Sequence, residues 1–359
     1  RLLIMTMCIQ ISAVQAQPIK SSLDALLSAH YPDRAAPGGM VMIKQEGQTL
    51  YAQGFGQRSL EQPSAIDQYS QFRMASVSKQ FTAMAIYQLQ KAGLLTLDEP
   101  IAHFFPSLAS PVNKITVRQL IQHSSGIIDY EPKLPQDLKV PLSDHDVLKL
   151  IASTDSTYFT PGTAFRYSNT GYCLLSLIVE QRTGMDYGSY VEGHIFKNLN
   201  IDDARVYAKS KEIAHRAYGY HPVNNGFNFA DQSMTSATLG DGGVYISAEG
   251  YHTWLSQQHP GALVDAAYLA FLEEEKFPVK AGVFYSMGWF VAEEADGTSC
   301  LFHSGESTGF HNFVYWQPTK GFQLSLFTNR DDLVISDFLA ELQGLVASQG
   351  HMTLKTDKP

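Results

Sequence analysis

The chain places its strand-like segments at its two ends and its helix-like segments between them. Near the amino end, residues 38–60 read as two apolar strands around a Glu46-Gly47-Gln48 turn, which predicts a hairpin. Near the other end, segments rich in aromatic and β-branched residues recur at 283–291, 299–303, 310–317 and 322–327. This order predicts an α/β (α+β) sandwich, with one antiparallel sheet built from both ends of the chain and flanked by terminal helices at 21–31 and 332–347.

The middle of the chain carries helical patterns separated by loops that contain proline and glycine. The predicted helices are 81–95, 117–122, 144–153, 172–183, 248–258 and 263–274. We therefore expect sheet parts at about 21–75 and 280–350 and an inserted, mostly helical part at about 78–275. All of these belong to one domain at 17–359. Clefts at such junctions commonly bind small molecules, so we expect the active site between the two parts.

Composition excludes several classes of partner. The formal net charge of −9 comes from acidic and basic residues that are interspersed, so no basic face for nucleic acid is expected. The 12 histidines include no HExxH or H-x-H pattern, and we expect neither a metal nor another cofactor. Outside the first 16 residues only Cys173 and Cys300 remain, a number that neither requires nor excludes a disulfide.

The first 16 residues read as a signal peptide. One basic residue precedes an apolar run from Leu2 to Val14, and small residues follow at the expected cleavage site. The run is too short to span a bilayer, which needs about 20 apolar residues. We expect an exported, periplasmic or secreted protein with no stable membrane anchor after the leader is removed. The alternative is a buried terminal helix or strand, and the oligomeric state stays open.

A serine and a lysine lie one helical turn apart at the start of an apolar helix. Ser76-Val77-Ser78-Lys79 stands where an irregular segment gives way to the run FTAMAIYQLQKAG. A helix that is apolar on most faces is buried, which would desolvate Lys79 beside Ser76. A serine hydroxyl needs such a neighbouring base to act as a nucleophile. The alternative is an ordinary helix start with an exposed lysine.

Two further triplets give the motif a context. Tyr167-Ser168-Asn169 follows a Pro-Gly turn and precedes a helix, and His303-Ser304-Gly305 ends a strand. With the S-x-x-K motif, these elements resemble the serine β-lactamase and penicillin-binding-protein superfamily, most closely its class C-like branch. Supporting stretches extend the resemblance over about 21–327 and include 117–126 (VRQLIQHSSG) and 240–243 (GDGG).

The resemblance implies roles for these residues. Ser76 would be the nucleophile, Lys79 its partner, and Tyr167 a general base that later returns a proton to the leaving group. Which of Lys79 and Tyr167 takes the first proton is open, because coupled groups need not titrate separately. The implied binding residues are Asn169, for an amide group of a small-molecule or peptide substrate, the triplet His303, Ser304 and Gly305 on the opposite wall, and Glu306, whose backbone N–H would join that of Ser76 in an oxyanion hole.

His303 stands where strict β-lactamases of this branch carry lysine. Histidine is mostly neutral at pH 7, so it suits a substrate carboxylate less well. We therefore expect hydrolysis of a small ester or a D-amino-acid peptide by an esterase- or carboxypeptidase-like enzyme. The alternatives are a true class C-type β-lactamase and a catalytically silent penicillin-binding or sensor domain. Loops such as 127–140 and 225–236 would set the choice of substrate.

A competing motif overlaps the third triplet. Residues 305–309 (GESTG) match G-x-S-x-G, which marks the strand-to-helix nucleophile elbow of α/β-hydrolases around a serine, here Ser307. That elbow requires a helix after the serine, whereas 310–317 reads as a strand. Its acid and base would have to be Asp331 or Asp332 and His351. The pattern therefore favours Ser76.

Overall fold

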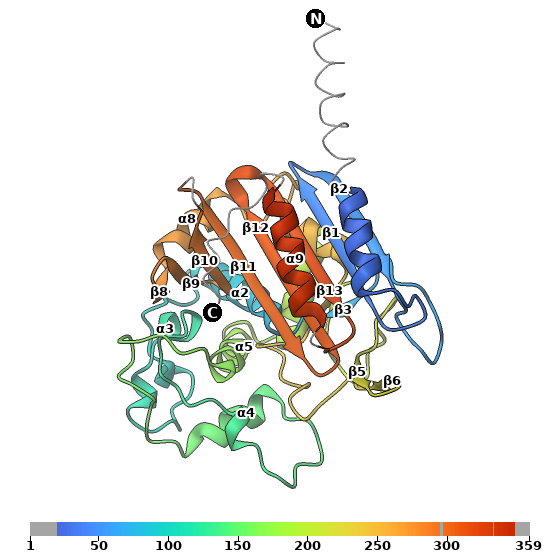
Figure 1. Cartoon of the computed structure of the whole chain (residues 1–359). Helices are drawn as coiled ribbons and strands as arrows, with labels where there is room; N and C mark the ends of the chain where they lie inside the picture. Colours follow the sequence, from blue (N-terminus) through green and yellow to red (C-terminus); the bar gives the residue numbers. More distant parts are fainter. Residues whose placement is uncertain (1–19, 295–296, 333, 349–359) are drawn as a thin grey trace, which may run out of the picture.

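The central element of the structure is an eight-stranded antiparallel sheet (Figure 1). The computed structural model describes residues 20–294, 297–332 and 334–348, so the predicted leader lies outside the described residues. Strands follow the order β2-β1-β13-β12-β11-β10-β9-β8 across the sheet. Their bounds are β1 Gly39–Gln45, β2 Gln48–Phe55, β8 Phe277–Lys280, β9 Val283–Ser286, β10 Trp289–Glu293, β11 Ser299–Ser307, β12 Phe310–Gln317 and β13 Phe322–Thr328.

Helices fill the middle of the chain, as predicted, and the last one follows the sheet. After a helix over 20–30, the α-helices are α2 Lys79–Lys91, α3 Val117–Ile121, α4 Asp144–Ala152, α5 Asn169–Thr183, α6 Tyr187–Val191, α7 Ala248–Trp254, α8 Ala266–Glu274 and α9 Val334–Ser348. Small sheets join β3 Phe72–Arg73, β7 Val244–Ile246 and β4 Arg205–Val206, and pair β5 Tyr220–Val223 with β6 Gly226–Phe229. Within the described ranges, no helix has the length and apolar character needed to cross a bilayer.

The two ends of the chain meet inside the sheet. β1 pairs with β2 on one side and with β13 on the other, in a register that runs from Gly39 opposite Thr328 to Gln45 opposite Phe322. The turn between β1 and β2 has positive φ at both Glu46 and Gly47, which suits the twist of a hairpin. The prediction of one sheet built from both ends is therefore confirmed.

Helices cover both faces of this sheet. Met40 and Met42 of β1 face a core shared with α2 and α5, whereas Val41 and Ile43 face a core shared with α9 and the helix over 20–30. Figure 1 shows these two terminal helices side by side on one face. Because successive side chains of a strand point to opposite faces, the near-continuous apolar run of β1 matches burial on both sides.

The structure corrects two predictions of local structure. The segment 283–291 is not one strand but the hairpin of β9 and β10, which reverses at Met287 and Gly288, both with positive φ. Met287 is not a typical turn residue, so no local pattern indicated this reversal. The segment 225–236, predicted as a loop, contains β6, and β8 was not predicted.

Candidate active site

Ser76 lies in a short 3-10 turn that continues directly into α2. The turn spans Ala75–Ser78, and the backbone N–H of Lys79 bonds back to the carbonyls of Ser76 and Val77. Ala75 has a φ of 48°, a left-handed conformation that is costly for a residue with a side chain. Ser76 is half-buried, while α2 is buried from Lys79 to Ile86. The apolar run thus seats the serine at the edge of the core.

Lys79 is fully buried, with 0% of its surface exposed, so the alternative of an exposed lysine is wrong. Its Nζ donates to Ser76 Oγ at 3.2 Å, to Asn169 Oδ1 at 2.8 Å and to the backbone carbonyl of Asp241 at 2.9 Å. Three oxygen atoms from three different segments thus surround Nζ. They fix Nζ beside the serine hydroxyl and tie three distant segments together at one atom.

Tyr167 lies against the same lysine. The centre of its ring is 4.9 Å from Lys79 Nζ, and the ring of His123 packs against it with centroids 4.2 Å apart. The Tyr167 hydroxyl is buried and has no hydrogen-bond partner among the described residues. A buried hydroxyl without a partner is uncommon, because it loses its bonds to water without replacement. Neither the donor nor the acceptor sites of this hydroxyl are therefore used within the described residues.

Asn169 is the first residue of α5, and its side chain is held at both ends. Oδ1 accepts from Lys79, and Nδ2 donates to Glu131 Oε1 at 3.0 Å. Its backbone N–H donates to Asp129 Oδ2 at 3.0 Å. The N-cap of α5 is Ser168, so Asn169 does not cap the helix. Burial raises the carboxyl pKa of both Asp129 and Glu131 above the usual range.

His303 lies on β11 and is only 2% exposed. Its Nδ1 contacts the carbonyl of Ser304 at 2.5 Å, so Nδ1 carries the proton, and Nε2 accepts from the Tyr285 hydroxyl at 3.2 Å. Burial lowers the His303 pKa to about 3. The ring is therefore neutral near pH 7, and this wall carries no positive charge from the residue that replaces lysine.

Gly305 lets β11 approach the segment that precedes the serine. A Cβ atom added to Gly305 would lie 2.2 Å from the carbonyl oxygen of Met74, closer than any side chain can approach. Ser304 and Glu306, on either side, are exposed. The third triplet thus needs glycine at this position for its strand to pack against the turn that holds Ser76.

The competing serine lacks the context of a nucleophile elbow. Ser307 ends β11, and the chain continues after a turn into strand β12. Asp331 accepts from the backbone of Gly309 and contacts His221, while Asp332 pairs with Arg330. His351 lies outside the described residues. The elbow hypothesis is therefore wrong, because no helix follows Ser307.

The sequence analysis did not single out five residues around the site. His123 accepts from the backbone N–H of Ser168, and the carboxylates of Asp129 and Glu131 contact Asn169. The carbonyl of Asp241 accepts from Lys79, and the hydroxyl of Tyr285 donates to His303. Burial lowers the His123 pKa well below its usual value. His123 and Asp241 lie in the stretches 117–126 and 240–243, and Asp129 and Glu131 lie in the predicted substrate loop 127–140, but none of these segments indicated a role for a single residue.

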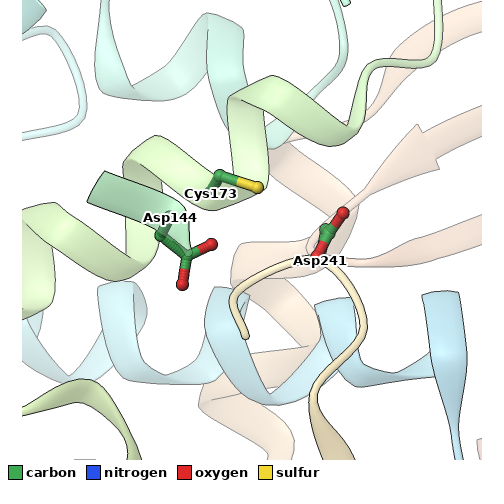
Figure 2. A group of neighbouring side chains, drawn as sticks. All are labelled: Asp144, Cys173 and Asp241. Carbon is green, nitrogen blue, oxygen red and sulfur yellow. The ribbon is translucent and has the colours of Figure 1, made fainter. Parts of the chain in front are cut away.

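Asp144, Cys173 and Asp241 form a buried group (Figure 2), and the backbone carbonyl of Asp241 accepts from Lys79. One potential ligand atom from each residue lies within 4.8 Å of the others. Burial, and then the charge of Asp241, raise the pKa of Asp144 to about 7, and burial raises the pKa of the Cys173 thiol well above its usual value. Near neutral pH the group therefore retains protons. Cys173 and Cys300 are both free, so they do not pair.

Fold and site together define a protein of the serine β-lactamase and penicillin-binding-protein class. The family model described as Beta-lactamase matches residues 23–347, and the chain belongs to that family. Penicillin-binding protein 4* of Bacillus subtilis is 32% identical over 188 residues, which are 51% of this chain and 41% of that protein. Protein flp of Staphylococcus aureus is 23% identical over 333 residues, 86% of this chain and 63% of that protein. The matches thus span less than two thirds of these relatives.

Solved structures share the fold. A penicillin-binding protein from Bacillus halodurans superimposes with a TM-score of 0.77 at 24% identity, covering 90% of this chain and 98% of that chain. A D-amino acid amidase from Ochrobactrum anthropi SV3, solved with L-phenylalanine amide, has a TM-score of 0.77 at 20% identity and covers 93% and 99%. At these identities the likeness establishes the architecture alone, and the fold predicted from the sequence is confirmed.

Proposed function

We propose that this protein is a serine hydrolase that forms an acyl-enzyme at Ser76 and cleaves a small ester or a D-amino-acid peptide. The observation that carries the proposal is the position of Lys79 Nζ, 3.2 Å from Ser76 Oγ inside a buried network. Membership of the family supports it, as does the fold shared with a D-amino acid amidase. The apolar segment within residues 1–16 supports the further proposal that the enzyme acts after export.

The reaction proceeds in two half-reactions. Ser76 Oγ attacks the acyl carbon, and its proton passes to Lys79 or Tyr167. The bond from the acyl carbon to the leaving oxygen or nitrogen then breaks, and the leaving group takes that proton. Water attacks the acyl-Ser76 ester next, which releases the acid and returns a proton to Ser76. The free Tyr167 hydroxyl and the buried lysine are the two groups that relay the proton.

The neutral state of His303 favours this activity over that of a true β-lactamase. A β-lactam carries a carboxylate, and a histidine with a pKa of about 3 gives it no counter-charge near pH 7. A silent sensor domain would share the nucleophile but would stop at the acyl-enzyme. Turnover therefore separates the enzyme from the sensor, and the preferred substrate separates the esterase or peptidase from the β-lactamase.

The test compares the wild type with Ser76→Ala on p-nitrophenyl acetate and butyrate, nitrocefin and a D-Ala-D-Ala peptide. Ser307→Ala is the matched control, because it removes the hydroxyl of the competing motif. We expect steady turnover of an ester or the peptide by the wild type and Ser307→Ala, with loss in Ser76→Ala, and a Ser76 adduct in mass spectrometry. Full turnover by Ser76→Ala would overturn the proposal. A Ser76 adduct formed without turnover would indicate the sensor.

A further inference from the structure

The amide of Asn169 contacts two neighbouring side chains, one at its oxygen and one at its nitrogen. Its oxygen accepts from Lys79, and its nitrogen donates to Glu131. The resemblance to the family implies that Asn169 hydrogen-bonds an amide group of the substrate. In this structure the Glu131 carboxylate accepts a hydrogen bond from one of the two N–H groups of that nitrogen and lies beside the other. A substrate that reaches this wall therefore meets a hydrogen-bond acceptor, which suits a donor group such as an amine.

Negative charge concentrates at the same wall. Asp129 contacts the backbone of Asn169 while Glu131 contacts its side chain, so two carboxylates flank one residue. The charges that act on Glu131 are those of Asp129 and Asp241, which oppose its ionisation, and that of Lys79, which favours it. Lys79 already donates to three acceptors. A further cation beside Glu131 would relieve this repulsion.

The opposite wall supplies no compensating positive charge from its triplet. His303 is neutral near pH 7 and uses both ring nitrogens inside the protein. The exposed charged residue next to that triplet is Glu306, another carboxylate. A substrate with a carboxylate on its acyl side would therefore face like charge on one wall and a neutral ring on the other.

We propose that the acyl part of the substrate carries a free ammonium group. The carboxylate of the exposed Glu131 binds this group, and the neighbouring carboxylate of Asp129 adds to the negative charge around it. This inference rests on the proposed acyl-enzyme chemistry at Ser76 and specifies its substrate class. The fitting substrates are esters, amides or short peptides of D-amino acids with an unblocked amine. N-acylated analogues and carboxylate-bearing acyl donors are disfavoured. Glu131 is thus the residue that determines specificity for charge.

The experiment varies only the charge of the acyl part. D-alanine p-nitroanilide with a free amine, its N-acetyl derivative and its N-succinyl derivative are cationic, neutral and anionic with one leaving group. For the wild type we expect kcat/KM to fall in that order, and a high salt concentration to reduce the preference for the amine. Glu131→Gln keeps an acceptor for Asn169 but removes the charge. We expect it to lower kcat/KM for the free amine about tenfold and to leave the N-acetyl substrate within about twofold.

Asp137→Asn is the matched control, since Asp137 is an exposed carboxylate of the same loop. It should leave all three values unchanged. If Ser76-dependent hydrolysis shows no preference for the amine, or if Glu131→Gln lowers all three substrates equally, the inference about charge is overturned and the acyl-enzyme stands. If hydrolysis of every substrate is unaffected by Ser76→Ala, the proposed function itself fails.

Discussion

Replacing Asp144 with asparagine tests whether the buried group of Asp144, Cys173 and Asp241 keeps a proton on Asp144 near neutral pH. In the folded protein the Asp144 pKa is raised from 3.8 to about 7. The stability that this group contributes is complete below about pH 3.8 and is lost as the pH rises towards 7, because the folded state keeps a proton that the unfolded chain has released. A shift of about three units corresponds to at most about 4 kcal/mol.

Urea unfolding between about pH 5 and 8 measures this contribution. Trp254, Trp289 and Trp316 are all buried, so tryptophan fluorescence follows the loss of the core. The asparagine of the Asp144→Asn variant would stay neutral at every pH, and its amide would find Asp241 Oδ1, which has no partner within the described residues. We expect the free energy of unfolding of the variant to increase relative to that of the wild type as the pH rises, by about 2–4 kcal/mol at about pH 8.

Asp146→Asn is the control on the same helix. Hydrogen bonds from Ser143 and Lys149 lower the Asp146 pKa to about 2, so Asp146 stays ionised over the same pH range. The difference in the free energy of unfolding between Asp146→Asn and the wild type should therefore stay constant. A constant difference for Asp144→Asn as well would refute the reasoning. So would a wild type that Zn²⁺ stabilises at the alkaline end of the range and EDTA destabilises, because a cation would then hold the place of the proton.

Three further predictions concern other residues. Tyr167→Phe should lower kcat at least about 100-fold yet leave the thermal unfolding midpoint nearly unchanged, since the hydroxyl has no partner to lose among the described residues; a large drop in the midpoint would contradict this. Gly305→Ala should cost about 1–3 kcal/mol in urea unfolding and also reduce activity, because its Cβ would meet Met74; unchanged stability would refute this packing. Acid should destabilise the fold through His252 and His303, whose pKa values are lowered from 6.5 to about 3. The stability that these two neutral rings contribute is present above pH 6.5 and is lost as the pH falls towards 3. The urea midpoint of His252→Gln should therefore decline less steeply with falling pH than that of the wild type.

The architecture was predictable because it depends on periodic patterns. The double-sided apolar run of β1 and the nearly all-apolar α2 each specify their own burial. The 3-10 turn that leads into α2 brings Ser76 and Lys79 together through local geometry alone. The contact of Lys79 with Asn169 joins residues 90 positions apart, and only the resemblance to a family placed them in one site.

The remaining features depend on contacts that have no local signature. Glu131 begins a three-residue 3-10 turn, Glu131–Lys133, which is too short for periodicity to indicate which side chain will reach Asn169. The buried group joins Asp144, Cys173 and Asp241 from two helices and a loop, and each residue alone suggests an ordinary surface acid or core thiol. The burial of His303 likewise follows from Tyr285 on a strand whose turn the sequence did not reveal.

The pairing of β1 with β13 also sets an order of events during synthesis. β1 emerges from the ribosome early, but the strand that covers its open edge begins only at Phe322. Until then a nascent chain holds one hairpin with an unpaired edge, a surface to which other extended chains can add. Gly305 and its strand also follow the helical segments, so the wall opposite Lys79 can form only after β11 has been synthesised. A chain that stops before β13 thus leaves the edge of β1 open and is prone to aggregate.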